Sequence, residues 1–258
     1  MWSAWPEALH LYLGRTMAMG GVGADAGAPL VLHHAANTPV AQVLGELRAQ
    51  IAARAMLQGP RRRSLHLTLS AGLCPALAFA LPTGVTRWAE RQAMAQAFAA
   101  TALGIDADAL ACEMDAARPG LAAVLTKQLL QELKAWAAQQ RWRIASIQPL
   151  WALASQCAAA RSPKVQALLL HEPDGLTLLG QGAAGTGEAG ELAALRMGAG
   201  QDMAVTPDLP AQTRRWLVGQ GLALDQLLTL GFGAERGAPM ADGPKLWASH
   251  WSIQGSSP

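Results

Sequence analysis

The stretch Leu121-Ala-Ala-Val-Leu-Thr-Lys-Gln-Leu-Leu130 decides the organisation of the chain, because an apolar run passes directly into a helix there. Residues 121–125 have the length and composition of a buried strand. Thr126 can cap the helix that follows. The apolar positions of this helix recur at helical spacing: Leu129, Leu130, Leu133, Trp136 and Ala137. Strands that alternate with helices in this way indicate an α/β protein.

The segments on either side of this unit continue the alternation. Arg118-Pro-Gly120 is a turn, so residues 110–114 and 121–125 are predicted to pair as a hairpin. Before them, a helix runs from Trp88 to Ala102 and stops at Gly104. After the helix that Thr126 opens, residues 144–147 form a short strand, and Pro149 lies in the first turn of a helix that runs to about Ala159.

The N-terminal part is predicted to contain strands at 9–13 and 30–34, separated by a loop rich in Gly and Ala. A helix follows Thr38 and Pro39, with one apolar stripe made of Val40, Val43, Leu44, Leu47 and Ile51. Residues 65–69 and 76–81 are two further strands, and the turn-like connection between them favours a hairpin.

The pattern of predicted elements changes in the last hundred residues, and residues 160–163 are the best candidate for a domain boundary. Strands at 165–170 and 176–179 are joined by the turn Glu172-Pro-Asp-Gly175. Residues 192–196 fit either a strand or a helix. A helix from about Pro210 to Gly221 precedes a central strand at 227–232.

Composition limits the class of protein. Hydrophobic residues make up 51% of the 258 positions and charged residues 15%, which excludes a disordered chain and leaves apolar surface for a partner to cover. The net charge of +2 gives no support for nucleic-acid binding. Three distant cysteines fit free thiols, and neither a signal peptide nor an 18-residue apolar run is found, so we expect a cytoplasmic protein.

One dense basic run, Arg61-Arg62-Arg63, follows Gly59-Pro60 in a predicted loop. Charge runs are mostly solvated. A basic loop can also face anionic lipid headgroups or an acidic partner, so these three arginines are the only partner-contact candidates that the sequence offers.

The sequence Gly180-Gln-Gly-Ala-Ala-Gly185 matches the G-x-G-x-x-G pattern of dinucleotide-binding turns, and Asp202 stands at the distance of a ribose ligand. Two observations oppose this interpretation. Too few residues remain for a complete dinucleotide-binding domain, and the preceding strand pairs through the turn at 172–175. A nicotinamide-dependent oxidoreductase is therefore kept as an alternative.

No other motif predicts a catalytic or metal site. His33 and His34 are adjacent on a strand and therefore point to opposite faces. His10 and His66 fit ordinary strand positions, and Ser70 and Ser146 lack the surroundings of a nucleophile. The acidic residues Asp106, Asp108, Glu113 and Asp115 fit a solvated edge, with Arg118 near enough to neutralise some of them.

The order of elements from Leu65 to Cys157 resembles the actin-like cytoplasmic proteins of type IV pilus and type II secretion machines. The similarity is carried by Leu81-Pro82, a helix with Glu90, the strand Ala111-Cys-Glu-Met114, the Ala-Ala strand before Thr126, and Arg143-Ile-Ala-Ser-Ile-Gln-Pro-Leu-Trp-Ala-Leu153. Strands at 165–196 resemble the opening of that fold's second half. The resemblance covers about two-thirds of the chain.

In actins and sugar kinases each half begins with a hairpin that bears an Asp-x-Gly phosphate loop. Here the first hairpin candidate is Tyr12-Leu-Gly-Arg-Thr16, with no Asp before the Gly, and in the second Asp174-Gly175 is an ordinary turn. An ATPase needs a carboxylate to hold Mg²⁺ or orient water. Hydrolysis is therefore not expected, and no motif supports nucleotide binding.

The resemblance implies an α/β, actin-like (RNase H-like) two-lobed fold with mixed sheets: residues 1–160 as a first lobe with an inserted β-α-β-β-α subdomain, and 161–258 as a second, reduced lobe. It implies a non-catalytic scaffold, peripheral to the inner membrane, that binds the cytoplasmic segment of a pilus or secretion assembly protein. A motor ATPase and a homo- or hetero-oligomer are further expected partners. We expect no catalytic residue, cofactor, metal or nucleic acid, and keep an active actin-like ATPase or sugar kinase as the alternative.

Overall fold

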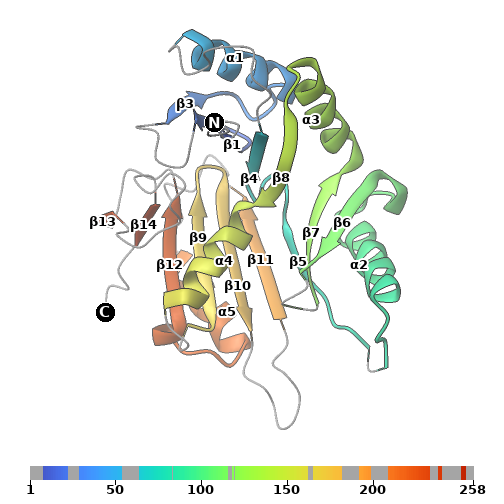
Figure 1. Ribbon diagram of the computed structural model, residues 1–258. Helices are drawn as coiled ribbons and strands as arrows, with labels where there is room; N and C mark the ends of the chain where they lie inside the picture. The colour runs from blue at the N-terminus through green and yellow to red at the C-terminus, as the bar shows by residue number, and fades with distance from the viewer. Residues whose placement is uncertain are drawn as a thin grey trace, which may run out of the picture.

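A five-stranded mixed sheet forms the N-terminal half of the protein (Figure 1). The computed structural model describes residues 8–22, 29–53, 64–82, 84–115, 118, 120–161, 165–181, 192–198, 209–232, 238–239 and 251–253. The strand order is β3-β2-β1-β4-β8, with bounds Leu30–His33, Met17–Val22, Ala8–Leu13, Ser64–Leu69 and Arg143–Pro149. Strands β1, β2 and β3 form an antiparallel meander, and β4 and β8 run parallel to β1.

Two helices contribute to the apolar core on one side of this sheet, α1 (Val40–Ala53) and α3 (Lys127–Gln139). The predicted apolar stripe of α1 is confirmed, since Val43, Leu44, Leu47 and Ile51 are buried. They pack with the side chains of β1 that point to this side, Leu9, Leu11 and Leu13, and with Leu133 and Trp136 of α3. Thr126 caps α3 as predicted, because its hydroxyl accepts a hydrogen bond from the Leu129 amide at 3.2 Å.

A three-stranded sheet, ordered β5-β7-β6, is inserted between β4 and α3 and packs against helix α2 (Figure 1). Its elements are β5 (Ala76–Ala78), α2 (Trp88–Leu103), the 3-10 turn η1 (Ala107–Ala109), β6 (Leu110–Met114) and β7 (Leu121–Thr126). The predicted β6–β7 hairpin is confirmed, and Gly104 ends α2 in the left-handed conformation.

The second large sheet has the order β11-β10-β9-β12-β14-β13. The bounds in that order are Leu192–Gly198, Gly175–Gln181, Ala167–Glu172, Leu227–Phe232, Trp251–Ile253 and Ala238–Pro239. Strands β9, β10 and β11 form an antiparallel meander, and β12 runs parallel to β9 after helix α5 (Leu209–Gly219) and the 3-10 turn η2 (Leu224–Gln226). This half therefore repeats the topology of β1, β2, β3, α1 and β4, and each half opens with a hairpin as the resemblance implies.

Helix α4 (Leu150–Arg161) joins the halves, and a single core cluster spans them. Trp151 is 2% exposed and donates its indole N–H to the Cys74 carbonyl at 2.9 Å. Around it pack Tyr12 of β1 and Phe232 of β12, whose rings lie 4.7 Å apart. No helix within the described ranges is long and apolar enough to cross a membrane.

Two predictions about strands are wrong. The Gly- and Ala-rich segment taken as a loop contains β2, in which the α-carbon of Gly20 lies so close to the core that an added Cβ would be 2.8 Å from Ile51. Residues 65–69 and 76–81 do not form a hairpin, because β4 is already paired on both edges, with β1 and β8, and β5 pairs with β7. Pro149 ends β8 and does not lie within α4.

Candidate functional site

The opening turns of the two halves contact each other, because Arg15, which follows β1, donates its amide to Asp174 between β9 and β10. In the first turn, the Gly14 amide donates to the Met17 carbonyl at 2.8 Å. A Cβ at Gly14 would lie 2.9 Å from the Tyr12 hydroxyl, so this position needs glycine for close packing. In the second turn, two residues join β9 to β10, and Glu172 is the register partner of Gly175.

Two carboxylates from the second turn bind donors of the first half. One oxygen of Asp174 accepts from the Arg15 amide at 3.0 Å and from the Ser70 hydroxyl at 2.7 Å. The carboxylate of Glu172 accepts from the Ala71 amide, at 3.2 Å and 3.1 Å for its two oxygens. We call this group, Arg15, Ser70, Ala71, Glu172 and Asp174, the hairpin junction.

A tight turn after β4 places the donors of the hairpin junction. The amides of Leu73 and Cys74 both donate to the Ser70 carbonyl, at 3.1 Å and 2.8 Å. The Ser70 amide donates to the carbonyl of Leu13 at 2.9 Å, which fixes this turn to the end of β1. The Ser70 hydroxyl and the Ala71 amide are therefore held at the carboxyl ends of β1 and β4, facing the second half.

The hairpin junction is buried. Glu172 is 6% exposed, Asp174 4%, and Ser70 is fully covered. A carboxylate at such depth is tolerated when hydrogen bonds replace its hydration, as the two amides and the hydroxyl do for Glu172 and for one oxygen of Asp174. Backbone N–H groups at turns are the donors that commonly hold phosphate. Here turn amides donate to side-chain carboxylates of the same chain.

The described ranges contain no group of three or more His, Cys, Asp or Glu side chains that could hold a metal ion. Burial raises the pKa of the Cys74 thiol to about 12 and that of Cys112 to about 11, so both stay protonated at neutral pH. A protonated thiol is a poor nucleophile and metal ligand.

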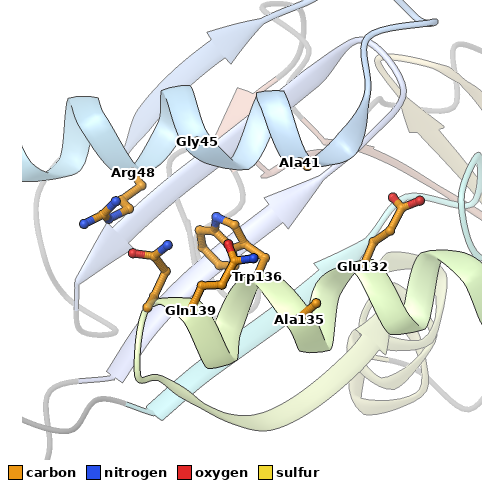
Figure 2. A pocket seen from close by; sticks show the side chains of 8 residues that line it. Ala41, Gly45, Arg48, Glu132, Ala135, Trp136 and Gln139 are labelled. Atoms are coloured by element: carbon orange, nitrogen blue, oxygen red, sulfur yellow. The ribbon is translucent and has the colours of Figure 1, made fainter.

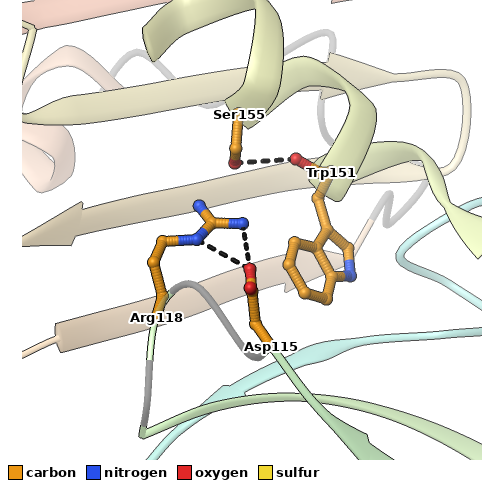
Figure 3. Close-up of polar contacts among 4 residues, drawn as sticks. All are labelled: Asp115, Arg118, Trp151 and Ser155. Atoms are coloured by element: carbon orange, nitrogen blue, oxygen red, sulfur yellow. Dashed lines mark hydrogen bonds and ion pairs between the residues drawn. The ribbon is translucent and has the colours of Figure 1, made fainter.

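The other candidate polar residues have local partners. His10 stacks on His66 with ring centroids 4.8 Å apart, and the His66 Nδ1 lies 2.9 Å from the Ser146 hydroxyl. Arg118 forms an ion pair with Asp115 at 2.6 Å, and in α4 the Ser155 hydroxyl donates to the Trp151 carbonyl at 2.8 Å (Figure 3). The expected neutralisation by Arg118 therefore holds for Asp115. The arginines Arg61, Arg62 and Arg63 lie outside the described residues.

The glycine-rich motif is not a dinucleotide-binding turn. Gly180 lies in β10, which pairs antiparallel with both β9 and β11, so the strand opens no crossover to a parallel neighbour. A Cβ at Gly180 would lie 2.7 Å from the Trp216 ring, which shows that this glycine serves packing. The meander therefore removes the structural basis of the oxidoreductase alternative at Gly180, and Gly182, Gly185 and Asp202 lie outside the described residues.

Three members of the hairpin junction, Ser70, Ala71 and Glu172, were not predicted from the sequence. One signal was available: two acidic residues flank Pro173 in an otherwise apolar strand pair. Their partners could not be found from sequence, because 101 to 159 residues separate them from these two acids.

Comparisons with known proteins place the fold. No family model and no curated protein matches the chain. Among solved structures it is similar to a Bacteroides thetaiotaomicron protein with an actin-like ATPase fold and unknown function, at 7% identity over 84% of this chain and 78% of that one, with a TM-score of 0.53. The protein therefore has an actin-like (RNase H-like) α/β fold with mixed sheets.

Two further similar structures belong to the machines that the sequence resembles. One is the cytoplasmic domain of EpsL, an inner-membrane component of the Vibrio cholerae type II secretion system, at 13% identity over 77% of this chain and 74% of that one, with a TM-score of 0.44. The other is the PilM–PilN type IV pilus biogenesis complex, at 11% identity over 83% and 70%, with a TM-score of 0.49.

Proposed function

We propose that this chain is a non-catalytic docking protein at the cytoplasmic face of an inner-membrane assembly of the type IV pilus or type II secretion kind. It binds the cytoplasmic segment of a membrane-anchored assembly protein, and a motor ATPase is a second partner. Residues 1–160 and 161–258 form its two lobes, and the basic run Arg61–Arg63 contacts anionic lipid headgroups or an acidic partner.

The hairpin junction is the observation that carries this proposal. In an actin-like NTPase the two opening hairpins hold phosphate between them. Here Glu172 and Asp174 bind the amides of Ala71 and Arg15, so a phosphate would have to displace them or lie against two buried negative charges. The hydrogen bonds of the hairpin junction stabilise the fold, and with it the surface for docking, while they fill the place where a nucleotide phosphate would bind for hydrolysis.

Recovery of partners from native membranes tests the docking function. The tagged full-length chain is purified from gently solubilised membranes of cells that produce it, and co-purifying proteins are identified by mass spectrometry. We expect an inner-membrane pilus or secretion protein with a short cytoplasmic segment. Recovery of no envelope-assembly protein, with the tagged chain folded and abundant, would contradict the proposal.

An active actin-like ATPase or sugar kinase is the rival, and the fold itself supports it, because the Bacteroides protein of similar structure has an actin-like ATPase fold. Mg²⁺-dependent turnover of ATP that is lost when Gly14–Thr16 is altered would favour this rival. The hairpin junction argues against it.

A further inference from the structure

A groove runs along the surface between α1 and α3, on the helices that share the first sheet's apolar core (Figure 2). Its volume is about 320 Å³. The residues that line it are Ala41, Gly45 and Arg48 of α1, and Glu132, Ala135, Trp136, Gln139 and Gln140 at α3. At Gly45 an added Cβ would meet no atom within 4 Å, so this stretch of α1 is open toward the groove.

The floor of the groove carries a hydrogen-bond donor, the indole N–H of Trp136. Trp136 is only 6% exposed and is held edge-to-face by Trp142, with ring centroids 5.1 Å apart. Its indole N–H makes no hydrogen bond with the described residues, and Figure 2 shows the ring nitrogen on the side toward α1. This N–H is open to the groove, so it can donate to an acceptor that enters there.

The two ends of the groove differ in charge. Arg48 lies at one end and Glu132 at the other (Figure 2). Arg48 is exposed and forms no ion pair within the described part of the chain. Glu132 accepts a hydrogen bond from Gln128 at 3.0 Å. A segment that fits here therefore carries an acidic side chain toward Arg48 and a basic one toward Glu132.

The shape selects a helix as the occupant. From Ala41 to Arg48 the groove follows α1 for about 10 Å, which is about two turns of an α-helix at 1.5 Å per residue. The walls are two helices whose backbone groups are bonded within each helix, so they offer no ladder for an added strand. Small residues at Ala41, Gly45 and Ala135 allow a third helix to approach closely.

We propose that this groove receives an amphipathic helix from the cytoplasmic segment of the partner protein. Its apolar side chains pack over Gly45 and Ala135, and an acidic side chain near its Arg48 end pairs with Arg48 and accepts the Trp136 N–H. This inference rests on the proposed docking function and names the surface and the chemistry of its partner.

Site-specific photo-crosslinking tests the groove. A photo-reactive amino acid is placed at Gly45 of the full-length chain in the cells that produce it, and at Gly219 as a control. Gly219 is also a helical glycine at which a Cβ would meet nothing within 4 Å, but it lies on α5. We expect an adduct at Gly45 only, with a membrane-protein peptide that has helical apolar spacing and an acidic residue. No adduct, equal adducts at both positions, a second copy of this chain, or a peptide without these features would overturn the inference.

Two substitutions separate this inference from the proposed function. Gly45→Leu fills the groove while it improves helix propensity, and Arg48→Glu reverses the charge at one end. We expect each variant to recover at least about tenfold less partner than the wild type, as hot-spot losses commonly do, while Gly219→Leu recovers the normal amount. If the wild type and both groove variants recover the partner equally well, the partner does not bind in this groove, while the docking function stands. If the wild type recovers no assembly protein, the docking function itself fails.

Discussion

The carboxylate of Asp174 connects the two halves at the scale of single residues. It accepts hydrogen bonds from the Arg15 amide and the Ser70 hydroxyl, and both donors lie more than a hundred residues away in sequence. A buried hydrogen bond to a charged group contributes about 1.5–3 kcal/mol to the free energy of unfolding. Removing the acceptor lowers the free energy of unfolding by a similar amount, because the donor then stays buried without a partner. Asp174 therefore acts as a structural link between the opening turns of the two halves.

We expect Asp174→Asn to lower the free energy of unfolding by about 1.5–3 kcal/mol. The asparagine side chain has no charge, and an NH₂ donor replaces one of the two acceptor oxygens. Urea denaturation measures the effect as a lower midpoint with an unchanged slope. Asp225→Asn is the matched control, since Asp225 is exposed, and it should change stability by less than about 0.5 kcal/mol. Equal effects of the two variants would show that the hairpin junction contributes nothing to stability.

His10, which stacks on His66, makes stability depend on pH. Burial, helped by the neighbouring His66, lowers the pKa of His10 from its ordinary 6.5 to about 4. The unfolded chain therefore binds a proton at this site before the folded chain does, and the free energy of unfolding falls as the pH drops from 6.5 to 4.

When the pH is lowered from about 7 to about 4.5, we expect the free energy of unfolding of His10→Gln to fall by about 1–3 kcal/mol less than that of the wild type. Urea denaturation at both pH values measures it. Other groups, such as His171, whose pKa burial also lowers, titrate in both proteins and cancel in the comparison. An identical loss in the variant would mean that His10 does not titrate in the way its burial implies.

At the scale of elements, Gly180 lets helix α5 approach the second sheet. A Cβ there would lie 2.7 Å from the ring of Trp216 and 3.3 Å from Leu222. We expect Gly180→Ala to destabilise the protein by about 1–2 kcal/mol through overpacking. Thermal or urea denaturation measures this.

Gly45→Ala is the contrasting change, because its Cβ enters open space on α1. It should raise the free energy of unfolding by about 0.5–1 kcal/mol, as expected for alanine in place of glycine inside a helix. If both variants changed stability in the same direction, backbone preference and not packing against Trp216 would explain the Gly180 result.

Elements with strong local signals could be predicted from the sequence. The α1 stripe, the Thr126 cap and the turn at 172–175 were all predicted and confirmed, because each rests on neighbouring residues. Strand β2 was missed because its glycines lower strand propensity, while packing against Ile51 and Leu11 stabilises it. The hairpin predicted at 65–81 failed because pairing on both edges of β4 is a tertiary property.

At the scale of the whole molecule, the order of elements predicted an actin-like fold, and the repeated topology of the two sheets confirms it. The candidate site was predicted only as two altered turns, near Gly14 and Asp174. That these turns meet, and that carboxylates of one bind amides of the other, follows from how the halves pack around Trp151 and Phe232. No local pattern encodes that contact.

Titration of the purified full-length protein with ATP and Mg²⁺ in a calorimeter tests the proposed non-catalytic role most directly, because we propose that Glu172 and Asp174 leave no room for phosphate between the two turns. We predict no saturable binding up to about 1 mM ATP, the range in which a weak but specific site would be detected. Saturable binding with Mg²⁺-dependent turnover, abolished by changes at Gly14–Thr16, would contradict the account.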